Sequence, residues 1–467
     1  MEFIDNTVND INIAYIGGGS KNWTLKLMAD LACESSLSGT VKLYDIDFDS
    51  ASLNESIGNS LCSREDVKGK WKYKAVRNIE EALDGADFVI ISILPGTLVD
   101  MISDVHVPEK YGIYQSVGDT TGPGGIMRAL RAIPIFAGFA QKIKEHCPAA
   151  WVINLSNPMA LCVRTLYKVF PNIKAFGCCH EVYSVKVLLS DMLYELKGIN
   201  DVPANKIKVN VSGINHFTWI DKASYNEIDL MPLFEEFTEK YYDEGYIDSF
   251  NRALDPEQAE YFRCANRVKF DLFRKYKLIA AAGDRHLAEF MPPLYLKNPQ
   301  TQTVALWKFA LTPVSFRLKQ HYQKVEKYRK IADGEKSFEI SRSTEEIVNQ
   351  IKALLGLEDI ITNVNLPNKG QMQGIQMGAV VETNALFSRN GVQPIVAGKL
   401  PMDVHNLIMN HVTNQEIILK AALNRDKELA FKAFMNDPLV NIHENDARKL
   451  FDEMLANIKE HLQGWNI

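Results

Sequence analysis

The stretch IAYIGGGSKNW (residues 13–23) decides the fold, because an apolar run ends in three consecutive glycines and a helical pattern then begins. Glycines at such a point permit a tight strand-to-helix turn and let the backbone approach a pyrophosphate at the helix N-terminus. Asn22 occupies the third glycine position of the G-x-G-x-x-G pattern, so a plain tight turn is an equal alternative. We expect Gly17, Gly19 and Ser20 to line a dinucleotide site.

A second apolar run, VKLYDI (residues 41–46), places an acidic residue near its end. A carboxylate there accepts hydrogen bonds from an adenosine ribose and disfavours a 2′-phosphate. Asp45 is therefore expected to select NAD over NADP. The alternative is a solvated acid at the end of a strand.

Outward from this turn, the first half of the chain alternates short β-rich runs with helical patterns such as IPIFAGFAQKIKEHC. The runs are almost continuously hydrophobic, which suits a parallel sheet buried on both faces. This rhythm predicts an α/β fold with a Rossmann-like, doubly wound parallel sheet. The expected strands are residues 11–16, 41–46, 86–93, 150–156 and 173–178.

The pattern changes after about residue 200. The stretch KIKVNVSGINHFTWI (206–220) predicts a strand that runs into a loop, and AVVETNALF is a further β-prone segment. Amphipathic helical patterns cover most of the remainder, at 247–330, 343–355, 402–435 and 445–462. We expect residues 1–200 to form an NAD-binding domain and residues 201–467 to form a mixed, mostly helical domain for substrate, metal and oligomerisation.

Composition excludes several classes of protein. Of 467 residues 46% are hydrophobic, which is enough for a sizeable core, and the formal net charge of −6 argues against nucleic-acid or anionic-membrane binding. No basic-then-apolar signal region opens the chain, and the run FVIISIL is too short to span a bilayer. Seven scattered cysteines are typical of a reducing compartment. We expect a globular cytoplasmic protein.

The stretch GCCHEV (177–182) places cysteine and histidine directly after a predicted strand, and His216 follows another strand. Thiolate and imidazole both coordinate divalent transition metals. Cys179 and His216 are therefore candidate ligands, although a buried core cysteine and a structural histidine are the ordinary alternatives. Asn157, in the polar loop NLSNP, is placed to reach the same crevice.

Taken in order, eight motifs along the chain resemble glycoside hydrolase family 4. That family has a Rossmann-like NAD domain and a Mn²⁺-dependent site, and it cleaves glycosides by C3 oxidation and C1–C2 elimination instead of with a carboxylate pair. The motifs are IGGGS, LYDID, GDTTGPGGIMRALR, INLSNP, CCHEV, GINHF, NVNLPNKGQ and GAVVE.

The resemblance implies roles for individual residues. Cys179 and His216 would hold Mn²⁺, and Asn157 would bind substrate hydroxyls near the metal. His180 would protonate or position the departing oxygen, a role that suits the near-neutral pKa of histidine. Relatives take their base from the second domain as a tyrosine or an acid. Asp284 is our candidate base, against helix capping as its alternative, and Tyr276 is a second possibility.

The resemblance also narrows the substrate. Phosphosugar members carry an arginine after the third strand, whereas residues 94–127 contain no arginine, so we expect a non-phosphorylated α-glycoside. The Cys-His-Glu-Val form looks most like the α-galacturonidase members. The alternatives are an α-galactosidase, α-glucosidase or α-glucuronidase of the same family. For a uronate carboxylate the candidate partners are Arg128, Arg131 and Arg285, of which the first two could equally be ordinary helix residues.

Two functions outside the family remain open from the residues alone. A plain NAD-dependent dehydrogenase would share the glycine turn and Asp45 but would not need a Cys–His metal pair. A non-catalytic NAD-binding sensor would not need polar loops after several strands. By the resemblance we expect a homodimer or homotetramer that acts on a small glycoside or uronide.

Overall fold

Six parallel strands form the centre of the protein, in the order β4-β3-β2-β5-β6-β7. The computed structural model describes residues 1–297 and 304–466. This strand order reverses direction beside β2, as in a dinucleotide-binding sheet, so the predicted doubly wound α/β fold is confirmed. The strands are β2 (Thr7–Ile16), β3 (Leu37–Tyr44), β4 (Lys70–Val76), β5 (Phe88–Ile91), β6 (Trp151–Asn154) and β7 (Lys174–Gly177).

The central strands are buried on both faces because their side chains are apolar on both faces. All four residues of β5, Phe88 to Ile91, are buried, and helices cover the sheet on each side. The edge strand β4 differs, since KWKYKAV alternates exposed lysines with buried Trp71 and Tyr73. It is a strand outside the five predicted ones, because this alternation lacks the continuous apolar run by which those were recognised.

The sheet continues beyond β7 with antiparallel strands from the second half of the chain, so that among the described residues all 14 strands join one sheet. β12 pairs with β7 at Asn365 and Gly177, and β13 then connects β12 to β8. The added strands are β8 (Lys208–Ile214), β9 (Phe217–Tyr225), β10 (Ile228–Asp229), β11 (Ile279–Ala280), β12 (Ile360–Pro367), β13 (Val380–Ser388) and β14 (Gly391–Pro394), while β1 (Glu2–Ile4) pairs with β2.

The stretch predicted as a strand entering a loop is a hairpin instead. β8 and β9 are joined through Asn215 and His216, and His216 has a left-handed φ of 64°. A turn this short occupies two residues only, so that the second strand follows at once.

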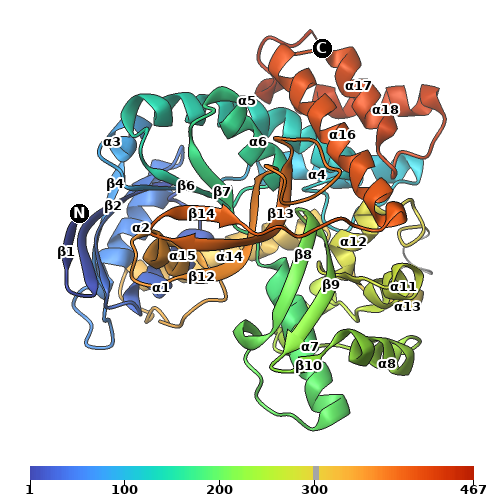
Figure 1. Cartoon of the computed structure of the whole chain (residues 1–467). Helices are drawn as coiled ribbons and strands as arrows, with labels where there is room; N and C mark the ends of the chain where they lie inside the picture. Colours follow the sequence, from blue (N-terminus) through green and yellow to red (C-terminus); the bar gives the residue numbers. More distant parts are fainter. Residues whose placement is uncertain (298–303, 467) are drawn as a thin grey trace.

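Helices cover both faces of the sheet and form most of the second half, as predicted (Figure 1). The segment 257–276 breaks into α10 and α11, because Asn266 is left-handed between them. The helices of the first half are α1 (Trp23–Ala32), α2 (Phe48–Leu61), α3 (Ile79–Leu83), α4 (Leu98–His106), α5 (Gly122–His146), α6 (Met159–Val169) and α7 (Glu181–Lys197). Those of the second half are α8 (Met231–Tyr241), α9 (Ser249–Arg252), α10 (Pro256–Phe262), α11 (Arg267–Tyr276), α12 (Asp284–Phe290), α13 (Val304–Trp307), α14 (Val314–Ala332), α15 (Ile347–Leu354), α16 (Met402–Asn424), α17 (Lys427–Asn436) and α18 (Glu444–Asn457).

The two halves of the chain interlock. α14 packs against α2 and α4, and α15 packs against α1, although more than 200 residues separate them in sequence. One hydrophobic cluster accordingly holds Ile13 and Leu43 together with Ile351 and Phe387. The predicted boundary near residue 200 stays a prediction. Within the described ranges, no helix is long and apolar enough to cross a membrane.

Candidate active site

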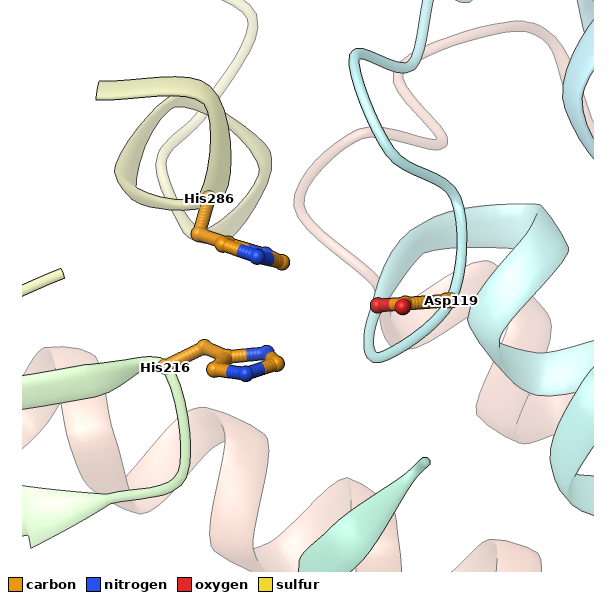
Figure 2. Close-up of side chains that lie close together, drawn as sticks. All are labelled: Asp119, His216 and His286. Atoms are coloured by element: carbon orange, nitrogen blue, oxygen red, sulfur yellow. The ribbon is translucent and has the colours of Figure 1, made fainter. Parts of the chain in front are cut away.

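Three side chains suited to binding a metal ion come together from three separate elements (Figure 2). Asp119 lies in the loop before α5, His216 in the β8–β9 turn, and His286 on α12. One ligand atom from each lies within 4.8 Å of the others. A carboxylate and two imidazoles are a donor set for divalent transition metals.

The loop that carries Asp119 is fixed at both ends by buried carboxylates from distant elements. Glu289 on α12 accepts the N–H groups of Val117 and Gly118 at 2.7 and 2.9 Å. Asp437 accepts the N–H of Gly122 at 2.9 Å, at the N-terminus of α5. Because these bonds bracket Asp119, its backbone is held without a contribution from its own side chain.

The Thr120 hydroxyl sets the tautomer of His216. Its Oγ1 lies 2.7 Å from Asp119 Oδ1 and 2.9 Å from His216 Nδ1. An ionised carboxylate only accepts, so the single hydroxyl proton goes to Asp119, and His216 Nδ1 must then donate its own proton. Nε2 of His216 is left with a free lone pair, as a metal ligand requires.

Burial sets the charge of the cluster. It lowers the pKa of His216, and it lowers that of His286 to about 3, with repulsion from His216 as the second cause. The rings stack with centroids 3.9 Å apart, as two neutral imidazoles can. Burial would raise the pKa of Asp119, but Arg128 and both histidines hold it well below its usual range. The cluster therefore presents one carboxylate and two neutral imidazoles.

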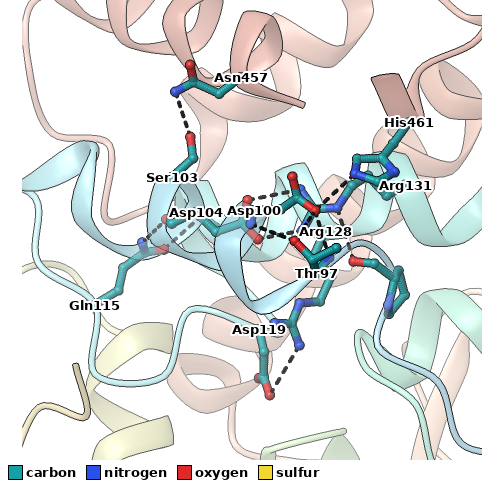
Figure 3. Close-up of polar contacts among 12 residues, drawn as sticks. Thr97, Asp100, Ser103, Asp104, Gln115, Asp119, Arg128, Arg131, Asn457 and His461 are labelled. Atoms are coloured by element: carbon teal, nitrogen blue, oxygen red, sulfur yellow. Dashed lines mark hydrogen bonds and ion pairs between the residues drawn. The ribbon is translucent and has the colours of Figure 1, made fainter. Parts of the chain in front are cut away.

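Asn157 and Arg128 complete the polar wall around Asp119. Asn157 Nδ2 donates to Asp119 Oδ2 at 3.2 Å. Arg128 Nη1 lies 3.9 Å from the same oxygen (Figure 3). Asn157 Oδ1 and the Nε and Nη2 groups of Arg128 are buried without a partner among the described residues. Buried polar atoms are seldom left unpaired, so these two side chains are available to a ligand. The structure thus brings the predicted site residues Asn157, Arg128 and His216 together around Asp119.

Arg131 lies one turn further along α5 and has different partners (Figure 3). Its Nη1 and Nη2 groups pair with both oxygens of Asp104, at 3.0 and 2.5 Å, and its Nε donates to the Pro95 carbonyl. Arg131 is 1% exposed and Asp104 wholly buried. The bidentate pair joins α4 to α5, and the structure does not bring Arg131 to Asp119.

Cys179 lies outside the group of three ligand-type side chains, against Met159, Val163 and Val380. Burial raises the pKa of its thiol well above the usual value. Its backbone is nevertheless tied to the hairpin turn that carries His216. Asn363 Nδ2 donates both to the Cys179 carbonyl and to Glu382 Oε1, at 3.1 and 2.7 Å.

Glu382 completes this connection. Its second oxygen, Oε2, accepts from Asn215 Nδ2 at 3.3 Å, next to His216 in the turn. One buried carboxylate on β13 therefore connects the loops that hold the two predicted metal ligands. Cys178 packs inward against the core of the parallel sheet.

His180 lies at the start of α7 and is 39% exposed. Its ring is 5.9 Å from that of Trp23, the first residue of the helix after the glycine turn, and its Nδ1 is 3.8 Å from Glu345. His180 thus faces the helix that follows the expected dinucleotide turn, while its neighbour Glu181 reaches His286 at 3.7 Å.

Asp284 is wholly buried in the first turn of α12, where Oδ1 accepts the Lys269 N–H at 3.1 Å. Burial raises its pKa to about 6, although Lys269 and the backbone N–H groups at the start of α11 oppose this. The contact is that of a carboxylate at the N-terminus of a neighbouring helix. The second base candidate, Tyr276, packs edge-to-face on Trp219.

The glycine turn is tight and leads directly into α1. A side chain at Gly17 would place Cβ 2.0 Å from the Ser92 carbonyl oxygen, and φ there is +93°, so only glycine fits. Ser20 Oγ accepts the N–H of Trp23 at 3.2 Å at the start of α1. Asp45 Oδ2 accepts the Gly19 N–H at 2.8 Å, which joins the end of β3 to the turn.

Sequence reasoning missed several residues of the cluster. Asp119 and Thr120 belong to the motif GDTTGPGGIMRALR, which carries the family resemblance, but neither was given a role. His286 was passed over beside its neighbours Asp284 and Arg285. The available indication was the density of polar residues in the two loops GDTT and GDRH, but pairing them requires the fold.

Comparison with known proteins matches the chain from end to end. Residues 12–195 match the family described as "Family 4 glycosyl hydrolase", and residues 211–440 match the C-terminal domain of the same family. An α-galacturonidase from Thermoanaerobacterium saccharolyticum is 60% identical over 468 residues, which cover 100% of both chains.

Solved structures agree. The crystal structure of LplD from Bacillus subtilis is 51% identical and covers 96% of this chain and 100% of its own, with a TM-score of 0.90. A 6-phospho-α-glucosidase from gut microorganisms, solved with NAD and Mn²⁺, covers 97% of this chain and 99% of its own, with a TM-score of 0.81; at 19% identity the likeness concerns the fold. Two family matches that together span most of the chain, and a relative 60% identical over its whole length, establish that it belongs to glycosyl hydrolase family 4.

Proposed function

We propose that this protein is an α-galacturonidase, which hydrolyses non-phosphorylated α-galacturonides with NAD and Mn²⁺ by oxidation at C3 and elimination between C1 and C2. The observation that carries the proposal is the 60% identity with an α-galacturonidase over the full length of both chains. The polar wall of Asn157 and Arg128 beside Asp119 supports a ligand with several hydroxyl groups and an acidic group.

NAD fits the glycine turn. Gly17 and Gly19 allow the turn, Ser20 orders the first turn of α1, and Asp45 lies at the end of β3, where a ribose is held in this fold. His180 faces the same helix through Trp23. We therefore assign the dinucleotide to the edge of the sheet between α1 and α7.

The metal is assigned to His216, through the Nε2 atom that Thr120 leaves free, and to Cys179. Support for this pair comes from the family resemblance and from Glu382, which connects the two loops through Asn363 and Asn215. A second donor set, Asp119 and His286 with His216, is favoured by the 4.8 Å grouping of their ligand atoms. Both sets contain His216.

In the reaction, bound NAD supplies a hydride acceptor and bound Mn²⁺ supplies an electrophile for the sugar oxygens. Asn157 would orient hydroxyl groups through the carboxamide oxygen that has no protein partner. His180 would donate a proton to the departing oxygen. Asp284 is proposed as the base for the C2 proton, and its contact with the N-terminus of α11 supports capping as the competing role.

The proposed setting is the cytoplasm, and the proposed assembly is a homodimer or homotetramer. All seven cysteines are free thiols, which suits a reducing compartment. The assembly rests on the family resemblance.

An assay with a dialysed, chelator-treated enzyme tests the proposal. An aryl α-galacturonide and a galacturonate disaccharide should be cleaved only when both NAD⁺ and Mn²⁺ are added, with no net NADH. Full turnover without the metal would contradict the proposal. Accumulation of NADH in proportion to product would identify a dehydrogenase, and faster cleavage of an aryl α-galactoside would assign the substrate to a neutral sugar.

Cobalt distinguishes the two donor sets. Co²⁺ bound to a thiolate gives an intense near-ultraviolet charge-transfer band, which carboxylate and imidazole ligands do not give. We expect this band in the Co²⁺-loaded protein and its loss in Cys179→Ser, with Cys178→Ser as the matched control. If the band survived in Cys179→Ser, or if the parent showed no band, the metal would be assigned to Asp119, His216 and His286 instead.

A further inference from the structure

Arginine side chains from three elements lie in the region of Asp119, and among the described residues two of them form no ion pair. Arg128 belongs to α5, Arg285 to α12 and Arg317 to the first turn of α14. Among the described residues, neither Arg285 nor Arg317 forms an ion pair, and the Nε of each is buried without a hydrogen-bond partner. Both side chains are partly buried, and a buried Nε group is seldom left without a hydrogen-bond partner, so these two charges call for a ligand.

Packing brings Arg285 and Arg317 to the same place. The Arg285 guanidinium lies 4.8 Å from the centre of the Phe262 ring, and Phe262 packs edge-to-face on Phe316, the residue before Arg317. Arg285 Nη2 also donates to the Ser116 carbonyl at 3.5 Å, and the Thr312 N–H donates to the same oxygen. Ser116 therefore ties the start of α12, the segment before α14 and the Asp119 loop together.

Three acids near these arginines already hold other groups. Glu181 Oε2 accepts the Gly283 N–H at 2.9 Å. Asp119 is shared by Thr120, Asn157 and Arg128. Glu289 takes up the N–H groups of Val117 and Gly118. The pKa of Arg317 is lowered to about 10, by burial first and then by repulsion from Arg285, with Asp119 only partly opposing this. The contacts through Phe262 and Ser116 thus place both guanidinium groups in one region, and neither has an ion-pair partner among the described residues.

We propose that Arg317, together with Arg285, binds the C6 carboxylate of the sugar and makes this site specific for a uronate. The inference rests on the proposed function, since it names the residues that would recognise the acidic group of that substrate. A planar guanidinium pairs with a carboxylate through two parallel hydrogen bonds, and a second arginine can neutralise what the first leaves. Arg131 is paired with Asp104, and Arg128 lies 3.9 Å from Asp119, so the two arginines without an acidic partner are the ones we assign to the carboxylate.

Arg317 makes a clean test because it has no protein partner to lose. We would compare Arg317→Gln and Arg317→Lys with Lys327→Gln, which removes an equal charge from an exposed position on the same helix. The measurements are kcat and KM for aryl α-galacturonide and aryl α-galactoside, and calorimetric binding of D-galacturonate, D-galactose, a 6-phosphorylated galactoside and NAD⁺.

We expect Arg317→Gln to weaken D-galacturonate binding and to lower kcat/KM for the galacturonide by roughly 30-fold or more, since it removes one side of a buried charge pair. Affinity for NAD⁺ and for neutral galactose should stay the same. Arg317→Lys should recover part of the loss, because the charge remains while the paired hydrogen bonds are gone.

Equal losses for the acidic and the neutral sugar, or no loss, would overturn the inference. Tighter binding of the 6-phosphorylated galactoside than of galacturonate would show that the arginines bind a phosphate. The failure of the proposed function looks different. If the parent protein cleaves no galacturonide yet binds D-galacturonate through Arg317, the arginine site stands and the proposed reaction falls.

Discussion

A single hydroxyl, that of Thr120, fixes the protonation of His216 by donating to Asp119 and accepting from Nδ1. Replacement by valine keeps the shape and removes both bonds, so the imidazole is free to turn or to change tautomer. We expect Thr120→Val to weaken Mn²⁺ binding by about 10- to 100-fold, the usual effect of losing a partner that orients a ligand. Titration of the protein with Mn²⁺ by electron paramagnetic resonance measures this.

Thr120→Ser is the control for that change. It keeps the hydroxyl and should retain most of the affinity. Unchanged Mn²⁺ binding in the valine variant would mean that His216 is not a ligand, or that another group holds its ring.

The ion pair of Arg131 and Asp104 leads to a prediction about stability. Both side chains are buried, and removing one leaves the other charge without a partner. We expect Asp104→Ala to lower the free energy of unfolding by about 3–5 kcal/mol. Denaturant unfolding measures the effect, and KM for the galacturonide should change little. If Asp104→Ala instead kept its full stability but had a raised KM for the galacturonide, Arg131 would be assigned to substrate binding.

The positions of single site residues could be predicted from the sequence where a local motif determines the backbone conformation. Gly17 and Asp45 were expected from a turn and a strand end, and the structure shows the turn, because a strand, a tight turn and a helix are neighbours along the chain. Asp119 and His286 could not be paired in this way. Their meeting depends on a loop and a helix 167 residues apart in sequence, and nothing local encodes it.

At the scale of elements, α12 carries His286 and Arg285 and also anchors the Asp119 loop through Glu289. Burial raises the Glu289 pKa to about 7, with the N–H groups of Val117 and Gly118 and the charge of Arg285 opposing and Asp119 adding to it. The folded protein therefore holds this proton more tightly than the unfolded chain does. Between the unfolded pKa near 4.5 and the folded pKa near 7, Glu289 should make stability fall as pH rises.

Glu289→Gln should remove that dependence. The amide keeps an oxygen for the two backbone N–H groups but does not ionise. As the pH is raised from mildly acidic to mildly alkaline, the free energy of unfolding of the parent should fall by about 3 kcal/mol more than that of the variant. Denaturant titrations of both proteins across that range measure the difference. Parallel pH profiles would show that Glu289 is ionised in the folded state at all these pH values.

Helices and strands could be predicted from the sequence where a single hydrophobic periodicity extends over the whole element. The five expected strands are β2, β3, β5, β6 and β7, and AVVETNALF forms most of β13. The predicted ends of helices and strands were wrong where a residue adopts a left-handed backbone conformation. Left-handed Asn266 splits a long amphipathic pattern into α10 and α11, and left-handed His216 turns an expected loop into a hairpin. These conformations depend on tertiary contacts, such as the bond from Asn266 Nδ2 to Asp248.

For the whole molecule, the continuation of the sheet is what builds the site. β12 adds to β7 beside the loop of Cys179, and β13 then leads to the hairpin of His216. Strands more than 160 residues apart in sequence thus become neighbours, and α14 returns across α2 with Arg317 at its start. The sequence pattern of the second half predicted a mixture of helices and strands. It could not predict which strands pair, because pairing between strands so far apart in sequence is not determined by neighbouring residues.

The proposed reaction gives the molecule a behaviour that a glycosidase with a carboxylate pair does not share. Oxidation at C3 makes the C2 proton acidic, and a base on the protein then removes it before the C1–O bond breaks. Hydrolysis of an α-galacturonide in D₂O should therefore place deuterium at C2 of the released sugar, which nuclear magnetic resonance detects. Deuterium at C2 also identifies the base. Asp284→Asn should suppress both the label and turnover if Asp284 is the base.

If Asp284 only caps α11, the variant should still incorporate deuterium, because an amide oxygen can accept the same Lys269 N–H. Product that is wholly protiated at C2, released at the normal rate by the parent enzyme, would indicate direct displacement at C1. A base shielded from solvent would give the same unlabelled product, but a substrate deuterated at C2 would then transfer its own label back to the product.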